Sequence, residues 1–236
     1  MKLIIEQPIR EKYPDLRIGI VVAKNVNNET YQTGLEEDVS KEFGAFAQKY
    51  ESVKFFEDEK NITAWREVYR SFGVNPKKKK PTAESLLTRV IKSGYVPHIS
   101  PAVDAYLTAE IIACLPVGGY DLERLTGDIY LKFSQGGEEF FGVGAETAES
   151  TTAGEVIYAD SERVLTRCWN YRDSDYTKID TGTKTLALFA EAPYHEITDD
   201  EVNDTMKAIA DKLEKFCSAE CTILFLGKDR NEIDIF

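Results

Sequence analysis

The spacing of apolar residues changes once along this chain, near Pro116, and this change limits the fold more than any other feature. Before it, apolar side chains recur every three or four residues, which predicts amphipathic helices. The expected helices cover residues 35–50, 63–73, 82–94 and 103–115. After it, short apolar runs separated by Gly, Asp and Ser predict strands at 128–133, 140–143, 155–159, 164–169 and 185–190.

Three further segments frame these blocks. The β-branched run at 16–23 is expected to be a buried strand. Thr198 and Glu201 have the spacing of a capping box, which predicts a helix from there to about Phe216. The run at 222–227 is expected to be a final buried strand. Helices and strands in separate blocks, with no repeat or linker between them, indicate a single compact α+β domain over residues 1–236, with mixed sheets.

The charge balance excludes one class of function. The chain of 236 residues has 41 acidic and 29 basic side chains, a formal net charge of −12. A protein that grips nucleic acid with its whole surface is basic, so DNA is not expected as a partner. Any contact with a polyanion must come from a local basic patch.

The cysteines and the N-terminus indicate a cytoplasmic protein without a bound metal or other cofactor. Cys114, Cys168, Cys217 and Cys221 lack the paired spacing of a structural zinc site, so reduced thiols are expected. Residues 1–8 include an acidic residue and a proline where a signal peptide needs an apolar run. No segment reaches the roughly 20 apolar residues of a membrane span.

Four consecutive lysines, Lys77 to Lys80, lie between Pro76 and Pro81 in this acidic chain. Four ammonium groups on a proline-stiffened loop could contact phosphates. A lysine run can also do no more than keep a loop soluble, and composition alone favours that second interpretation.

Two other segments are candidates for a ligand site. Residues 115–121 contain Gly118-Gly119 and are expected to form a turn at a helix exit, where glycines let backbone amides approach a ligand. The alternative is a tight turn that needs glycine for its backbone conformation alone. Residues 167–175 mix aromatic residues, arginines and aspartates after a strand, which suits either a polar pocket or a surface ion pair.

His98 and His195 are the only histidines. A lone histidine is more often structural or surface-exposed than catalytic, and the chain has no Gly-x-Ser-x-Gly nucleophile motif. Neither histidine is therefore assigned a catalytic role.

Taken in order, these segments resemble the B3/B4 domain of the β subunit of bacterial phenylalanyl-tRNA synthetase, in a free-standing form. The resemblance runs from Trp65 to Phe189. It is carried by Trp65-Arg66, residues 72–76, residues 81–86, Arg89, Pro97, Pro101, Val103-Asp104, residues 115–122, residues 154–160 and residues 167–173. The flanking residues 1–64 and 190–236 are expected to complete the same domain.

The resemblance implies a compact domain with a pocket, which in the synthetase binds tRNA and hydrolyses tyrosine wrongly esterified to the tRNA for phenylalanine. The family's editing groups are partly replaced here. The family's histidine falls on Gly118, an asparagine falls on Leu107 and a glutamate falls on Phe189, while Glu191, two residues on, would face the same side. Asp104 and Asp121 are retained.

The first hypothesis is therefore a protein that binds aminoacyl-tRNA and hydrolyses a mischarged ester in trans. The expected substrate-binding residues are Gly118, Gly119, Tyr120, Asp121, Trp169, Asn170, Arg172 and Asp173, and the expected tRNA-binding residues are Lys77, Lys78, Lys79 and Lys80. The alternatives are a non-catalytic module for tRNA or an amino-acid-like molecule, and a hydrolase of another small ester.

Overall fold

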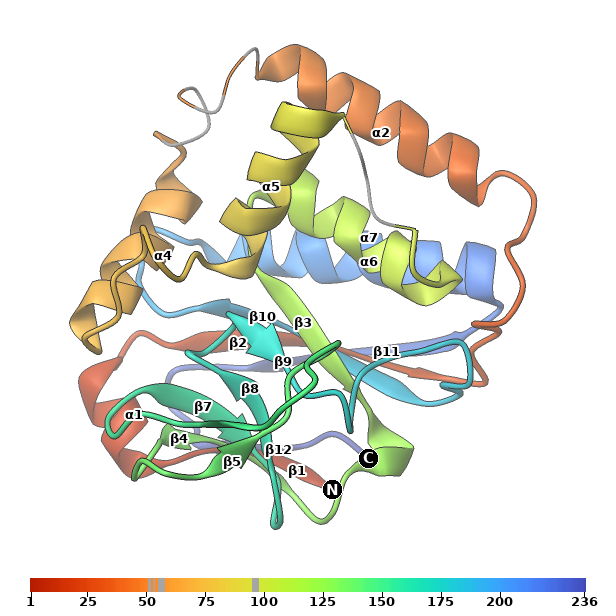
Figure 1. Ribbon diagram of the computed structural model, residues 1–236. Helices are drawn as coiled ribbons and strands as arrows, with labels where there is room; N and C mark the ends of the chain where they lie inside the picture. The colour runs from red at the N-terminus through yellow and green to blue at the C-terminus, as the bar shows by residue number, and fades with distance from the viewer. Residues whose placement is uncertain (51, 53, 55–57, 95–97) are drawn as a thin grey trace.

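Three layers stack in this protein: helices, a four-stranded sheet and a six-stranded sheet (Figure 1). The computed structural model describes residues 1–50, 52, 54, 58–94 and 98–236. The helices are α1 (Gln7–Lys12), α2 (Leu35–Lys49), α4 (Lys60–Ser71), α5 (Thr82–Ser93), α6 (Pro101–Ala113) and α7 (Asp199–Cys217), with a short 3-10 helix η1 (Leu122–Arg124). The strands are β1 (Lys2–Ile5), β2 (Arg17–Lys24), β3 (Val117–Asp121), β4 (Ile129–Phe133), β5 (Glu139–Phe140), β6 (Glu149–Ser150), β7 (Val156–Ala159), β8 (Val164–Arg167), β9 (Arg172–Asp173), β10 (Leu186–Ala192), β11 (Glu220–Leu226) and β12 (Glu232–Asp234).

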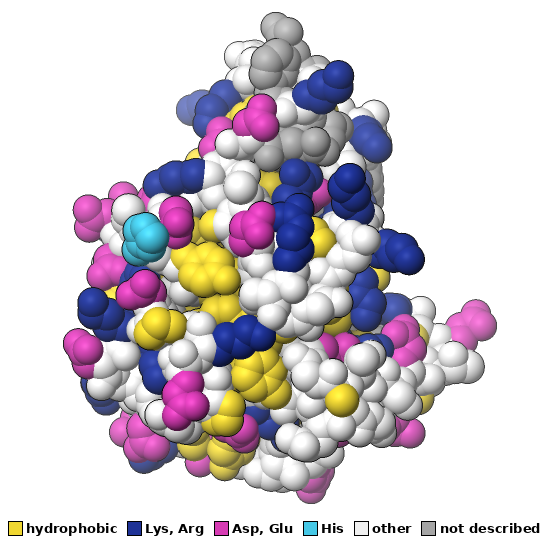
Figure 2. All heavy atoms as spheres, turned by 90° about the vertical axis from the view of Figure 1, so that its left-hand side faces the viewer, with side chains coloured by type: hydrophobic (Ala, Val, Ile, Leu, Met, Phe, Trp, Pro, Cys, Tyr) yellow, Lys and Arg dark blue, Asp and Glu magenta, His cyan; other side chains and the backbone are white. Residues whose placement is uncertain are grey.

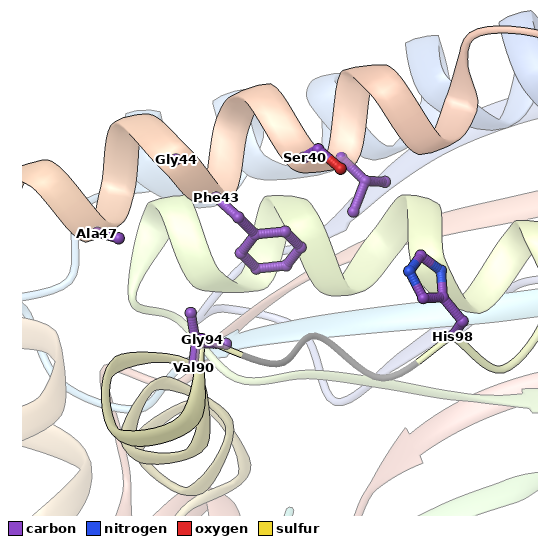
Figure 3. A pocket seen from close by; sticks show the side chains of 8 residues that line it. Ser40, Phe43, Gly44, Ala47, Val90, Gly94 and His98 are labelled. Atoms are coloured by element: carbon purple, nitrogen blue, oxygen red, sulfur yellow. The ribbon is translucent and has the colours of Figure 1, made fainter.

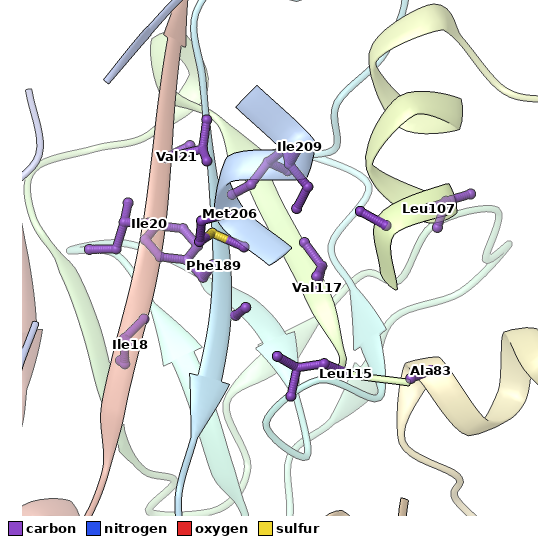
Figure 4. Packing of buried hydrophobic residues seen from close by; sticks show 14 of the residues in the cluster. Ile18, Ile20, Val21, Ala83, Leu107, Leu115, Val117, Phe189, Met206 and Ile209 are labelled. Atoms are coloured by element: carbon purple, nitrogen blue, oxygen red, sulfur yellow. The ribbon is translucent and has the colours of Figure 1, made fainter. Parts of the chain in front are cut away.

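The four-stranded sheet forms the middle layer, in the antiparallel order β11-β2-β10-β3. Every residue of β10 is buried, and so is every residue of β2 except Lys24. Strands covered on both faces read as continuous apolar runs, which is the pattern of these two segments. On the helical side, α7 covers β2: a Cβ at Gly19 would lie 2.5 Å from Val202 and 2.8 Å from Met206. Met206, Ile209 and Val21 belong to the same buried cluster (Figure 4).

The six-stranded sheet has the order β12-β1-β4-β7-β8-β9. In it, β1 pairs in parallel with β4 and antiparallel with β12, so the two ends of the described chain lie side by side. The short hairpin β8–β9 ends this sheet at one edge, and its turn faces the free edge of β3 in the sheet above. This junction between the sheets holds the candidate site described below.

The sequence-based prediction of an α+β fold is confirmed, and the four expected helices of the first block are present as α2, α4, α5 and α6. The helix expected from residue 63 begins three residues earlier, at Lys60. The capping box at α7 is also present: the Thr198 hydroxyl accepts from the Glu201 amide, and the Glu201 carboxylate accepts from the Thr198 amide at 2.9 Å.

The prediction of a turn over residues 115–121 is wrong, because Val117–Asp121 form the strand β3. Neither Gly118 nor Gly119 has a positive φ. The reason for glycine at position 119 is packing: a Cβ there would lie 2.1 Å from the carbonyl oxygen of Ala187 on β10. A Cβ at Gly118 would meet nothing within 4 Å.

Other strand predictions need smaller corrections. β11 was expected to be buried and final, but it lies at a sheet edge with Ile223 exposed, and β12 follows it. The runs at 140–143 and 164–169 contain strands that end earlier, at Phe140 and Arg167. The short elements α1, β1, β6, β9 and β12 were not predicted. Pro97, one of the residues that carry the resemblance, lies outside the described residues.

Candidate functional site

A small cavity lies where the free edge of β3 meets the β8–β9 turn. Four elements supply its walls: β3, the β8–β9 hairpin, β10 and the start of α5, with one side chain from β7. The lining residues are Thr82, Val117, Gly118, Tyr120, Tyr158, Thr166, Trp169, Asn170, Asp173, Phe189 and Glu191. Polar groups that are far apart in the sequence therefore converge on one space.

A chain of hydrogen bonds reaches Asp173 in this cavity. The hydroxyls of Tyr120 and Thr166 lie 2.6 Å apart, and Thr166 donates to Oδ1 of Asp173 at 2.7 Å. This bond uses only one of the two carboxylate oxygens. Burial of the carboxyl raises the pKa of Asp173 to about 6, and the Thr166 bond opposes that rise. Asp173 is therefore mainly ionised at pH 7 and able to accept a proton.

A second carboxyl, Glu191, lies on the β10 side of the cavity and accepts a hydrogen bond from the Tyr158 hydroxyl at 2.6 Å. Burial raises the pKa of Glu191 to about 8. Glu110 on α6 is a third buried acid nearby, and burial raises its pKa well above the usual range. Glu191 is therefore mainly protonated at pH 7, whereas Asp173 is not. Environments that separate the pKa values of neighbouring carboxyls are typical of acid–base sites.

Asn170 contributes a hydrogen-bond donor without a partner. Its Oδ1 accepts from the Tyr69 hydroxyl at 2.7 Å, and its backbone carbonyl accepts from the Thr82 hydroxyl. Its amide nitrogen Nδ2 is buried and has no hydrogen-bond partner among the described residues. An unsatisfied buried donor costs roughly 1–3 kcal/mol, so a cavity-lining Asn in this state is a candidate for contact with a ligand oxygen.

The cavity is small. Its volume is about 20 Å³, which accommodates roughly one water molecule. Sites for small ligands usually measure roughly 300–1,000 Å³. Tyr120, Tyr158 and Phe189 fill the remaining space, with ring centroids 5.8 to 6.1 Å apart. A Cβ at Gly118 would meet no atom within 4 Å, so there is open space beside this residue.

The structure brings five of the eight expected substrate-binding residues to the cavity: Gly118, Tyr120, Trp169, Asn170 and Asp173. Gly119 packs against β10 instead. Asp121, at the far end of β3, accepts hydrogen bonds from the Glu123 amide and the Thr183 hydroxyl. Arg172 points away from the cavity and pairs with Glu149 at 3.0 Å.

The lysine loop, Lys77 to Lys80, divides into two pairs. Lys77 and Lys78 are exposed. Lys80 is half-buried and contacts the Glu84 carboxylate at 3.3 Å. Lys79 turns inward, and its Nζ lies 3.5 Å from the sulfur of Cys168. On the side of the molecule that carries α1 and α4, basic and acidic side chains are interspersed (Figure 2).

Residue-by-residue reasoning missed several lining groups. Thr166 and Tyr158 lie on strands that the apolar pattern of the sequence predicted. That pattern does not show that these strands face β3 and β10 of the other sheet. Phe189 and Glu191 entered only through the family resemblance. Glu110, which does not line the cavity itself, had a direct signal: it is the one charged residue in the mainly apolar run from Ala105 to Leu115. An acid in such a run is either paired or functional.

A larger groove of about 380 Å³ lies between α2 and α5, lined by residues that include Ser40, Phe43, Val90 and His98 (Figure 3). The imidazole Nδ1 of His98 lies 3.0 Å from Oδ2 of Asp104, which also accepts from the Tyr31 hydroxyl at 2.8 Å. Residues 95–97, between Gly94 and His98, are outside the described residues. His195 is exposed next to Glu196.

In the described ranges, no cluster of three or more His, Cys, Asp or Glu side chains is arranged to hold a metal ion, and the four cysteines are free. No helix in the same ranges combines the length and the apolar character that a bilayer crossing requires.

Comparison with known proteins gives one family match. The model of the family described as "B3/4 domain" matches residues 64–218. No curated protein matches the chain. Among solved structures, an N-terminal fragment of the phenylalanyl-tRNA synthetase β-subunit from Pyrococcus horikoshii is similar, with a TM-score of 0.46 and 11% identity over 93% of this chain and 49% of that one. This chain thus spans about half the length of that fragment.

Proposed function

Because this chain belongs to the B3/4 domain family, we propose that it binds the 3′ end of an aminoacylated tRNA and hydrolyses the aminoacyl ester. The observation that carries the proposal is the buried amide of Asn170, whose Nδ2 has no partner among the described residues, in the same cavity as the carboxylate of Asp173. The Asn170 amide is a hydrogen-bond donor for a developing oxyanion, and the Asp173 carboxylate is a proton acceptor.

In this mechanism the ester approaches from the open space beside Gly118, and a water molecule occupies the small cavity. Asp173 takes a proton from the water molecule while the water oxygen attacks the carbonyl carbon. Nδ2 of Asn170 donates to the carbonyl oxygen as negative charge develops there. When the tetrahedral intermediate collapses, the bond to the ribose oxygen breaks, and that oxygen receives the proton from Asp173. The products are a free amino acid and a tRNA with a free hydroxyl.

The cavity volume supports this placement of the two reactants. About 20 Å³ suits a water molecule and excludes an amino-acid side chain. The aminoacyl group would then lie outside, along the edge of β3. The groups that carry the chemistry, Asn170 and Asp173, also differ from the histidine that the synthetase domain uses, which is replaced here by Gly118.

The test is deacylation of a panel of correctly and wrongly charged tRNAs by the purified protein. We expect Asp173→Asn to lower the rate roughly 10²- to 10⁴-fold, and Asn170→Ala to lower it roughly 10²- to 10³-fold. Asp175→Asn is the matched control, because Asp175 lies two residues away and pairs with Lys178 at 2.7 Å instead of lining the cavity. Equal activity of Asp173→Asn and the wild type would reject the mechanism.

The same cavity volume favours one second candidate, a binding module without catalysis. A space that admits no amino-acid side chain could still adjoin a surface that holds the tRNA end. Retention of tRNA on a filter, with no loss of ester from any member of the panel, would support this candidate over hydrolysis.

A further inference from the structure

The turn between β8 and β9, residues 168–171, is held from one side by the segment that runs from α4 through the lysine loop to α5. The Tyr69 hydroxyl donates to Oδ1 of Asn170, and the Thr82 hydroxyl donates to the Asn170 carbonyl. Between these two anchors, Nζ of Lys79 lies 3.5 Å from the sulfur of Cys168 and 5.6 Å from the centre of the Tyr171 ring. The lysine loop therefore touches the turn that carries the unpartnered amide of the site.

This turn has an unfavourable backbone. Cys168 and Trp169 both have positive φ, 47° and 69°, although neither is glycine. Consecutive non-glycine residues in this region are strained and persist only where the surroundings impose them. The Trp169 indole fixes one side by packing against Trp65 and Tyr13, with ring centroids 5.3 and 4.9 Å away. Lys79 is the contact on the other side that an incoming ligand could change, because it is half-buried and not fully enclosed.

The partner of Lys79 is a weak one. Burial raises the pKa of the Cys168 thiol to about 11, so the sulfur is a neutral thiol at pH 7. A neutral thiol is a poor hydrogen-bond acceptor for an ammonium group. A phosphate oxygen forms a shorter, charge-assisted bond with the same ammonium. Phosphate near the loop would therefore displace the thiol as the partner of Lys79.

We propose that Lys79 is a positioning residue that couples phosphate binding at the lysine loop to the turn carrying Asn170. A backbone phosphate of a bound RNA takes the Lys79 ammonium away from Cys168 and Tyr171, and the strained turn then changes conformation. Exposed Lys77 and Lys78 supply affinity, whereas Lys79 transmits binding to the site. This inference rests on the proposed function for the identity of the ligand, an RNA. It adds a means by which a cavity of about 20 Å³ responds to that ligand.

Tryptophan fluorescence is a direct test, because Trp65 and Trp169 are the only tryptophans and their rings are in contact. Uncharged tRNA should produce a saturable change in emission of the wild type. Lys79→Met should lose most of this amplitude while still binding tRNA. The matched double variant Lys77→Met/Lys78→Met should need a several-fold higher tRNA concentration but reach the full amplitude. Lys79→Arg keeps the charge, and circular dichroism establishes that each variant is folded.

Several outcomes would overturn the coupling: no emission change when the filter assay shows bound tRNA, no tRNA binding at all, or full amplitude in Lys79→Met. A second titration with inorganic polyphosphate separates the possible sources of phosphate. A response to polyphosphate but none to tRNA would reject an RNA ligand. Because neither titration contains an ester, a failure of hydrolysis leaves the result intact. Deacylation by a protein whose fluorescence does not respond would reject only the coupling.

Discussion

Two adjacent glycines in β3 have different physical roles. A Cβ at position 119 would lie 2.1 Å from the Ala187 carbonyl oxygen and 2.7 Å from Leu188, so the strands would have to separate. We expect Gly119→Ala to lower the free energy of unfolding by about 2–3 kcal/mol. Gly118→Ala is the control, since its Cβ meets open space, and should stay within about 0.5 kcal/mol. Urea denaturation of both variants measures the difference, and equal losses would contradict the packing argument.

Glu191 makes stability depend on pH. Its pKa is raised by burial from 4.5 in the unfolded chain to about 8, so the folded protein holds an extra proton between these values. The free energy of unfolding therefore falls as pH rises through this window, with a slope of at most about 1.4 kcal/mol per pH unit from this group. Asp173, with a pKa of about 6, contributes in the same direction.

Glu191→Gln should flatten this profile, because an amide does not titrate. The measurement is urea denaturation of wild type and variant from pH 5.5 to 8.5, where the wild type should lose stability faster. A variant profile parallel to that of the wild type would mean that Glu191 is ionised in the folded state throughout.

At the level of elements, Arg66 on α4 and Glu84 on α5 join the two helices that flank the lysine loop. The guanidinium contacts both carboxylate oxygens, at 2.8 and 2.9 Å, and Glu84 is almost fully buried. Removing one partner of such a pair leaves a charge in a poorly solvated place. Glu84→Ala should therefore lower the free energy of unfolding by about 2–3 kcal/mol.

Glu67→Ala is the matched control, an acid-to-alanine change on α4 itself. Glu67 pairs with Arg70, and both side chains are about half exposed, so the cost should be below about 1 kcal/mol. Thermal denaturation at low and high salt compares the two variants. A loss for Glu84→Ala no larger than for Glu67→Ala would show that the pair does not hold α4 against α5.

The elements that the sequence predicted share one property: their apolar pattern is local. Helices α2, α5 and α7 show periodic apolar residues over 12 or more positions, and the α7 capping box is a short-range signal. β3 was missed because its Gly-Gly pair is explained by contact with Ala187, almost seventy residues away. β11 was misjudged for a similar reason, since its apolar residues do not reveal that it lies at an edge. The site combined both cases: Asn170 and Asp173 stood out locally, whereas Thr166 and Tyr158 needed the register of β7 and β8.

At the scale of the whole molecule, the acidic balance limits how the proposed RNA ligand could bind. A surface of net charge −12 repels RNA in general, so the proposed association would depend on a few oriented contacts. Lys77 and Lys78 are exposed, and Lys79 connects their loop to the turn at the cavity. A protein built this way would bind RNA weakly unless the 3′ end also reaches the edge of β3.

The topology further predicts that the segment matched by the family model, 64–218, does not fold alone. Strand β2 lies between β10 and β11 in the middle sheet, and β1 lies between β4 and β12 in the other, yet none of β1, β2, β11 and β12 belongs to that segment. Without them, β10 keeps only β3 as a neighbour, and the apolar face of α7 loses the strand it covers. We propose that residues 1–63 and 219–236 complete the same domain, so fragment 64–218 should lack a cooperative unfolding transition, whereas the full chain should unfold in one step. Near-ultraviolet circular dichroism and urea denaturation of both proteins test this, and a sigmoidal transition of the fragment would place the domain boundary inside the chain instead.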